Sequence, residues 1–334
     1  MSASRLNKIL KLGAIIYVSL YTAFFLRITP VKLLTATQAC SLTERGRDHG
    51  QKCARRSTIV TAYYNLKQSS KHTETEFEAW NARFLRLSDS LIIFTDSESV
   101  SHIQELRSSS SHAECTQYIL QELNSTFTAK LTNWRVQHEL DPEKHVHRSH
   151  ELYIVWNQKS DWLAQAQMWN PFQSDFFFWC DMGQFRDELF VRTLEANNWF
   201  WIERPDFAPE GRMVFLSAEP FSQSEVSQDS KKHFISSLSI RLGGGNFGGR
   251  ALAIQLWRQR YYSKLLEFIE SGKFAGKDQT VMSSLCLEIP SLCYLVESHA
   301  LQSFGDKWFA MQHVLHGNVE IEEYKPHALR QIKN

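Results

Sequence analysis

Residues 176–186 have the sequence FFFWCDMGQFR, in which five apolar or aromatic residues run directly into an acid. A continuous apolar run of this length predicts a strand that is buried on both faces, as in a parallel sheet. In open α/β sheets, ligands bind outside the carboxyl ends of the strands. Asp181 would therefore be a carboxylate held at a ligand-binding edge. The alternative is a structural acid that caps the next helix and pairs with Arg186.

Two earlier stretches have the same form: residues 57–64 (STIVTAYY) and residues 91–96 (LIIFTD), the second of which also ends in an acid, Asp96. Helical patterns over residues 151–169 and 250–272 alternate with such strands, and Gly272 is a typical helix stop. This alternation predicts an α/β fold with a mainly parallel central sheet flanked by helices. We also expect a helical segment over 99–123, broken at its serines, and strands over 213–221 and 236–245.

The N-terminal region predicts a membrane anchor. Residues 12–26 (LGAIIYVSLYTAFFL) carry no charge, follow Arg5, Lys8 and Lys11, and precede Arg27. The basic flank would stay cytoplasmic. An uncleaved signal anchor is favoured because the passable cleavage site, TQA before Cys40, lies far from the apolar segment, with a cleaved signal peptide or a buried N-terminal helix as alternatives. The expected organisation is a cytoplasmic tail and transmembrane anchor over 1–27, a stem over 28–56 and one lumenal domain over 57–334. Such a single-pass type II membrane protein would face the lumen of the Golgi or endoplasmic reticulum.

Charge and cysteine content narrow the function classes. The chain has 37 Lys and Arg against 36 Asp and Glu, so its charge gives no case for nucleic acid as a partner. Its six cysteines form no Cys-x-x-Cys motif, which argues against a zinc ribbon. The pairs nearest in sequence are Cys40 with Cys53 and Cys286 with Cys293, and bridges there would suit an oxidising lumen. Asn124 begins the one glycosylation sequon, NST.

Five segments carry a family resemblance, and they occur in this order: TIVTAYYNL (58–66), LIIFTD (91–96), ELYIVWNQK (151–159), FFFWCDMGQFR (176–186) and GKDQTVM (276–282). Together they resemble the HtrL/YibB family, which includes WlaTC-like proteins, over roughly residues 57–290. That family in turn resembles nucleotide-sugar glycosyltransferases of the GT-A type. The resemblance implies a GT-A-like fold and sugar transfer, and it implies neither a donor sugar nor an acceptor.

The resemblance also implies roles for particular residues. GT-A enzymes carry Asp-x-Asp after a core strand to hold a metal on the donor diphosphate, whereas this chain has Asp181-Met182-Gly183. Asp181 would then hold Mn²⁺ or Mg²⁺ with help from elsewhere. Without metal, Lys159 and Arg186 would stabilise the leaving diphosphate. Asp278 would deprotonate the acceptor or orient the sugar, or it would only cap a helix. The other residues expected to bind the nucleotide sugar are Thr61, Tyr63, Asp96, Gly183, Gly248 and Gln279.

Residues 243–248 (GGGNFG) formally match the Gly-x-Gly-x-x-Gly pattern of dinucleotide-binding loops. No strand–helix–strand unit surrounds them, so a glycine-rich loop that closes over donor or acceptor, or a plain tight turn, is favoured. The leading hypothesis is a glycosyltransferase that moves a sugar from a nucleotide-diphosphate donor to a hydroxyl of a glycan or glycoconjugate. The alternatives are a non-catalytic sugar- or partner-binding lumenal module on the same fold and a dinucleotide-dependent oxidoreductase.

Overall fold

A computed structural model of the chain describes residues 53, 56–66, 72–197, 209–227, 233–297, 307–317 and 322–326. All of them fall within the unit formed by residues 49–334. The predicted anchor, and the predicted stem apart from Cys53 and Arg56, lie outside the described residues. Within the described ranges, no helix is long and apolar enough to cross a membrane.

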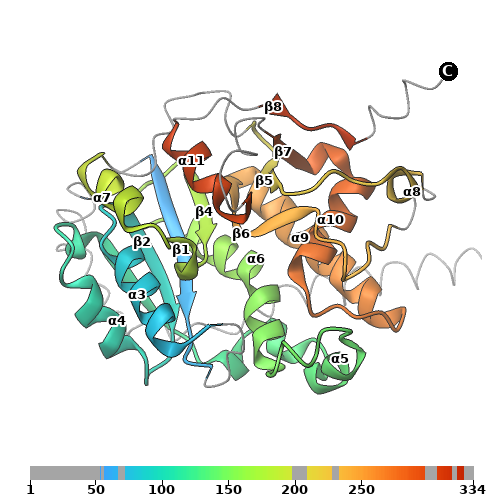
Figure 1. Cartoon of the computed structure of the whole chain (residues 1–334), viewed down its shortest axis with the longest axis horizontal. Helices are drawn as coiled ribbons and strands as arrows, with labels where there is room; N and C mark the ends of the chain where they lie inside the picture. Colours follow the sequence, from blue (N-terminus) through green and yellow to red (C-terminus); the bar gives the residue numbers. More distant parts are fainter. Residues whose placement is uncertain are drawn as a thin grey trace, which may run out of the picture. The chain divides into compact units, whose positions relative to one another are not determined.

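The described strands form one eight-stranded sheet in the order β3-β2-β1-β4-β6-β5-β7-β8 (Figure 1). Their bounds are β1 Ser57–Tyr63, β2 Ser90–Thr95, β3 Thr116–Leu120, β4 Phe176–Cys180, β5 Met213–Ser217, β6 Leu242–Arg250, β7 Cys293–Glu297 and β8 Glu322–Glu323. Strand β6 is antiparallel to β4 and β5, and β8 is antiparallel to β7. The α/β class is confirmed, but the expected mainly parallel sheet is mixed, because the chain reverses after β5 and inserts β6 between β5 and β4.

The order of the strands reverses next to β1. From β1 the chain moves outward through β2 to β3, and it later returns to add β4 on the other side of β1. Strand β1 is parallel to both β2 and β4, so all these strands present their carboxyl ends at one edge. The pairing of β1 with β4 ends at Val60 and Trp179, just before Asp181. The edge between β1 and β4 is thus a topological switch point, where open sheets bind ligands.

Helices cover both faces of the sheet. Side chains alternate along a strand, so that Ile59 packs in one apolar cluster and Val60 in the other. Figure 1 shows α3, α4 and α7 to the left of β1 and α6, α9 and α10 to the right. The helix bounds are α3 Glu74–Leu85, α4 Val100–Arg107, α5 Trp134–Leu140, α6 Glu151–Trp169, α7 Glu188–Asn197, α8 Gln223–Val226, α9 Ala251–Glu270, α10 Asp278–Glu288 and α11 Ala310–His316.

Local sequence signals explain where the main helices begin and end. Thr73 and Glu76 form a reciprocal capping box that starts α3. Helix α6 has the bounds predicted from the sequence and ends at Asn170 in the left-handed conformation, with φ 41°. Helix α9 ends just before Gly272, whose φ of 66° confirms it as the helix stop.

Two predicted elements are wrong. Only the first part of 99–123 is helical, because residues 116–120 pair with β2 and form the strand β3. Residues 243–248 lie inside the strand β6 and form neither a loop nor a turn between a strand and a helix. The dinucleotide-binding hypothesis therefore loses its structural basis, since that motif requires a loop at a helix N-terminus.

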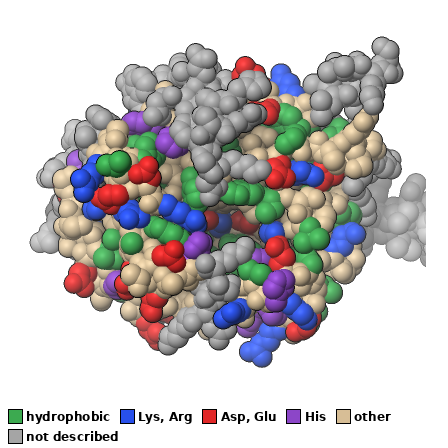
Figure 2. Space-filling model, in the orientation of Figure 1, with side chains coloured by type: hydrophobic (Ala, Val, Ile, Leu, Met, Phe, Trp, Pro, Cys, Tyr) green, Lys and Arg blue, Asp and Glu red, His purple; other side chains and the backbone are tan. Residues whose placement is uncertain are grey.

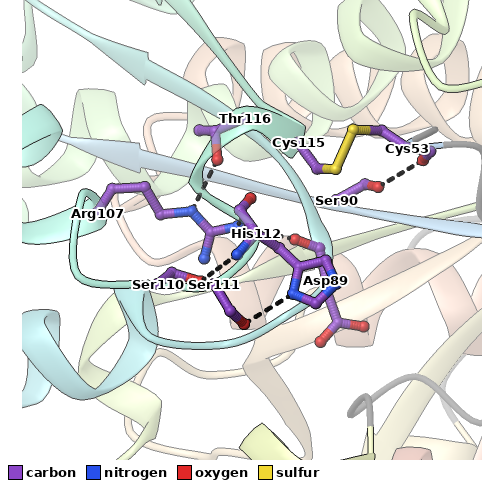
Figure 3. Close-up of a disulfide and its surroundings, with 9 residues drawn as sticks. All are labelled: Cys53, Asp89, Ser90, Arg107, Ser110, Ser111, His112, Cys115 and Thr116. Carbon is purple, nitrogen blue, oxygen red and sulfur yellow. Dashed lines mark hydrogen bonds between the residues drawn. A yellow bond between two sulfur atoms is a disulfide. The ribbon is translucent and has the colours of Figure 1, made fainter. Parts of the chain in front are cut away.

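The disulfides differ in part from the nearest-neighbour pairs. Cys286 pairs with Cys293 as expected, but Cys53 pairs with Cys115 and so cannot pair with Cys40, which lies outside the described residues. Figure 3 shows the Cys53–Cys115 bridge beside the buried side chain of Arg107. Arg107 donates hydrogen bonds to Thr116 Oγ1 (2.7 Å) and to the carbonyl oxygen of Asp89 (3.0 Å). The Cys53–Cys115 bridge and the Arg107 side chain together fix the start of β3 against β2 and against the segment before β1.

Candidate functional site

A buried lysine lies between two carboxylates at the switch-point edge. Lys159 comes from α6, Asp181 directly follows β4, and Asp278 is the first residue of α10. The Lys159 Nζ atom is 3.1 Å from Oδ2 of Asp181, 3.1 Å from Oδ2 of Asp278 and 3.0 Å from the carbonyl oxygen of Gly244. We call Lys159, Asp181 and Asp278 the Lys159 cluster.

The three members of the cluster differ in exposure. The side chains of Lys159 and Asp278 are 3% and 4% exposed, whereas that of Asp181 is 36% exposed. Figure 2 shows this face of the molecule hollowed near its middle, with acidic side chains visible at depth. Asp181 is thus the member of the cluster that a ligand would meet first.

Burial and ion pairing set the protonation of the cluster. Burial acts to lower the pKa of Lys159, but the neighbouring carboxylates of Asp181 and Asp278 outweigh it and raise that pKa above its ordinary value. Burial raises the pKa of Asp278, and Lys159 counteracts this only in part. Lys159 is therefore an ammonium, and Asp278 holds a proton more tightly than an ordinary aspartate, as suits a group that takes part in proton transfer.

Trp179 fixes the orientation of Asp181. Its indole Nε1–H donates to Oδ1 of Asp181 at 2.6 Å, and the backbone N–H of Asp181 donates to the carbonyl oxygen of Gly245 at 2.8 Å. The Trp179 ring stacks on Trp162 with ring centroids 5.7 Å apart. Sequence reasoning missed this role of Trp179. The two-residue period of a strand was the available signal, because it places Trp179 and Asp181 on one face.

The glycines of β6 make room for the site. A Cβ atom on Gly244 would lie 2.8 Å from Cγ of Gln279 and 3.2 Å from Oδ2 of Asp278. A Cβ on Gly245 would lie 2.1 Å from Nε2 of Gln184, in the 3₁₀ turn η4 (Met182–Gln184). The missing side chains thus let α10 and η4 approach the first residues of β6.

A network behind the cluster supports Asp278. Asn157, two residues before Lys159 on α6, donates to the carbonyl oxygen of Gly276 at 2.9 Å and accepts a 2.6 Å hydrogen bond from the hydroxyl of Tyr261. The backbone N–H of Gln279 donates to Oδ1 of Asp278 at 2.8 Å. Asn157 thus holds the segment that leads into α10, and the sequence offered no signal for it beyond its place next to Lys159.

The structure brings Gln279 to the cluster and leaves other predicted residues elsewhere. Gly248 lies inside the sheet, opposite Phe178 and Val214, and not at its carboxyl edge. Asp96 accepts the backbone N–H of Ser99 at 2.7 Å, ahead of α4. Gly183 lies in η4, directly after Asp181 and Met182.

Two predicted residues belong to β1. Thr61 is buried there, and its Oγ1 has no hydrogen-bond partner among the described residues. Tyr63 ends β1, is partly buried and has a pKa raised first of all by burial. Because β1 borders the switch point, Tyr63 lies at the carboxyl edge of the sheet, where a ligand would bind.

Arg186 is exposed, and aromatic rings hold its guanidinium. The guanidinium carbon lies 4.2 Å from the ring centroid of Trp80 and 4.5 Å from that of Phe309. Its Nε–H donates to the carbonyl oxygen of Gly183 at 3.3 Å. These contacts anchor Arg186 beside η4. The structural alternative required Asp181 to cap the following helix, but its side chain makes no capping hydrogen bond to η4.

The residues around Asp181 do not fit the metal site that the resemblance implied. Both carboxylate oxygens of Asp181 accept hydrogen bonds, from Trp179 and from Lys159. Across the described ranges, no group of three or more His, Cys, Asp or Glu side chains is placed to hold a metal ion. A divalent cation such as Mg²⁺ takes about six oxygen ligands, and the cluster offers two carboxylates already joined to an ammonium.

Comparison with known proteins gives a family and a distant structural likeness. No curated protein matches the chain. Among solved structures, the chain is similar to the apo form of mouse xyloside xylosyltransferase 1, at 10% identity and a TM-score of 0.38, over 81% of this chain and 97% of that one. A likeness of that size does not bear on activity. The family model described as "Bacterial protein of unknown function (HtrL_YibB)" matches residues 55–314, so the chain belongs to the HtrL/YibB family.

Proposed function

We propose that this protein is a glycosyltransferase that moves a sugar from a nucleoside diphosphate to a hydroxyl of a glycan or glycoconjugate. The observation that carries the proposal is the Lys159 cluster, which three separate elements deliver to the switch point of the sheet. A buried acid with a raised pKa beside a partly exposed carboxylate is an arrangement that suits proton transfer at a bound ligand. The resemblance of the family to GT-A enzymes supplies the reaction class.

The chemistry suggests one task each for Asp278, Asp181 and Arg186. Transfer breaks the bond between the anomeric carbon and the diphosphate oxygen and forms a bond from that carbon to the acceptor oxygen. Asp278 would accept the proton that the acceptor hydroxyl loses. Asp181 would accept hydrogen bonds from hydroxyls of the donor sugar or ribose through the part of its carboxylate that is exposed. Arg186 would bind the diphosphate, whose charge grows as it leaves.

The remaining predicted residues complete the donor site in this proposal. Tyr63 and Thr61, on the strand that borders the switch point, would line the part that holds the base and ribose, together with Asp96. Gly183, two residues after Asp181, and Gln279, directly after Asp278, would lie against the sugar. Gly248 would have only a structural role, because it is enclosed between β4 and β5.

We further propose that the domain faces an oxidising lumen, as a single-pass type II membrane protein of the Golgi or endoplasmic reticulum. The two disulfides within the described ranges support this, since such bridges persist in secretory compartments and are rare in the cytosol. Asn124 of the NST sequon is exposed, as glycosylation requires. Protease protection in sealed microsomes tests the topology, which fails if the domain is digested without detergent.

The direct test of the function is the unfolding temperature of the full chain with a panel of nucleoside diphosphates and NAD(P). A ligand that binds only the folded state stabilises it by about 2.7 kcal/mol at a hundredfold excess over Kd. We expect one nucleoside diphosphate to raise the unfolding temperature, and Arg186→Gln to weaken that effect. NAD(P) should have none. A nucleotide that binds without turnover of its sugar would instead indicate the non-catalytic binding module.

A further inference from the structure

We infer that the site needs no divalent cation, because Lys159 is the cation that holds Asp181 and Asp278 together. The inference rests on the proposed function for its catalytic consequence, but the binding behaviour that it predicts can be measured without any nucleotide. It departs from the GT-A resemblance, in which a metal ion joins the carboxylates to the donor.

The contacts of Lys159 are those of an ammonium group. Its Nζ atom lies 3.0–3.1 Å from three oxygens, of Asp181, Asp278 and Gly244. The ammonium donates hydrogen bonds to Oδ2 of Asp181 and to the carbonyl oxygen of Gly244, and it forms an ion pair with Oδ2 of Asp278. A bound Mn²⁺ or Mg²⁺ would require about six oxygens at roughly 2.1 Å. The oxygens of the cluster are therefore arranged around a lysine and not around a metal.

The ammonium is also fixed in place. The side chain of Lys159 is 3% exposed, and its Nζ lies 5.8 Å from the ring centroid of Trp179. The indole N–H of Trp179 is in turn hydrogen-bonded to Asp181. A divalent ion that reached Asp181 from the open side would sit next to this buried positive charge, and the two would repel each other. The position of the second acid of Asp-x-Asp is Gly183, which has no side chain to compensate.

If Lys159 takes the place of a metal ion, a variant without Lys159 should bind one. Lys159→Ala removes the ammonium and leaves two carboxylates that face one space, both buried or partly buried. Two carboxylates without a counter-charge are a site for a hard divalent cation. The variant should therefore gain metal binding that the natural chain lacks.

The experiment measures binding of Mn²⁺ alone to the full chain, by electron paramagnetic resonance, and the unfolding temperature with Mn²⁺ or a chelator. We expect no saturable binding and no shift for the natural chain. Lys159→Ala should bind Mn²⁺ at least tenfold more tightly, with a rise in unfolding temperature, and the double variant Lys159→Ala/Asp181→Asn should lose this gain. Lys144→Ala is the control, because it removes a lysine that pairs with one carboxylate, that of Glu139, and so leaves no pair of carboxylates behind.

The inference would be overturned if the natural chain bound Mn²⁺ and Asp181→Asn abolished that binding. It would also be overturned if Lys159→Ala folded but bound Mn²⁺ no more tightly than the natural chain. If Lys159→Ala does not fold, the comparison of the natural chain with Asp181→Asn decides alone. Because no nucleotide is present, this result is independent of the nucleotide panel that tests the proposed function. A chain that binds no nucleotide but behaves as expected towards Mn²⁺ would refute the transferase and leave Lys159 as the resident cation.

Discussion

The indole N–H of Trp179 donates a 2.6 Å hydrogen bond to Oδ1 of Asp181, two residues later in the chain. Trp179 is fully buried in β4, whereas Asp181 is the partly exposed member of the Lys159 cluster. The bond fixes one carboxylate oxygen, and the other accepts from Lys159. A residue of the core thus sets the direction of the carboxylate that a ligand would meet.

Trp179→Phe keeps an aromatic ring on Trp162 but removes the donor to Asp181. We expect sugar transfer to fall roughly tenfold or more, because a hydrogen bond to a charged group contributes about 1.5–3 kcal/mol. Trp162→Phe is the matched control, since it removes a 2.8 Å indole bond to Gln121 Oε1 in the same stack. The measurement is the turnover of each variant relative to the natural chain. Equal losses would mean that Trp179 acts through packing alone.

Gly244→Ala should damage the site more than the fold. Its new Cβ would press on Gln279, 2.8 Å away, and on the carboxylate of Asp278, whereas in Gly243→Ala the nearest atom is Leu216 Cβ at an ordinary 3.4 Å. We expect Gly244→Ala to lose at least tenfold in kcat, and Gly243→Ala to keep kcat and unfolding temperature close to those of the natural chain. Similar kinetics for the two variants would show that β6 does not position Asp278.

The raised pKa of Asp278 predicts a pH dependence of stability. Since burial raises this pKa in the folded state, the folded chain binds the proton more tightly than the unfolded chain does. The contribution of Asp278 to the free energy of unfolding should therefore fall as pH rises from about 4, the value for a free aspartate, to the raised pKa. Urea unfolding of the natural chain and of Asp278→Asn across this range isolates the effect. A difference between them that grows in favour of the natural chain with rising pH would contradict it.

The two disulfides should differ in their contribution to stability. Cys53 and Cys115 are 62 residues apart, and Cys286 and Cys293 are 7 apart. In the chain-entropy description, these loops correspond to about 4 and about 2 kcal/mol. Urea unfolding of Cys53→Ser/Cys115→Ser and of Cys286→Ser/Cys293→Ser should show the larger loss for the first pair. The reverse order would indicate that residual structure in the unfolded chain, and not loop length, dominates.

The sequence predicted those elements whose conformation is determined by their own residues. The apolar runs of β1, β2 and β4 and the helix α6 were found in this way, and so was the acid after β4. Strand β3 was missed because it is half-exposed and owes its conformation to pairing with β2. The strand predicted over 236–245 was displaced, because β6 covers Leu242–Arg250: its glycines disfavour a strand, and the pairing with β4 and β5 overrides that preference.

The sequence did not predict how the members of the Lys159 cluster are arranged. Lys159, Asp181 and Asp278 were each singled out, yet their meeting depends on how α6, β4 and α10 pack, which no local pattern encodes. The consequence is chemical: Lys159 was expected to meet a diphosphate, and in the structure its charge is enclosed by two carboxylates. Likewise, the pairing of Cys53 with Cys115 follows from the position of β3 beside β2 and not from distance in sequence.

The most direct test of the central claim is the release of nucleoside diphosphate from a panel of nucleotide sugars, with sugar acceptors present. The account predicts turnover of at least one donor by the natural chain. It also predicts a loss of about a hundredfold or more in Asp278→Asn, the size expected for a lost general base, while the variant still binds the nucleoside diphosphate. Unchanged turnover by Asp278→Asn, or no turnover of any donor by a chain that binds its nucleotide, would contradict it.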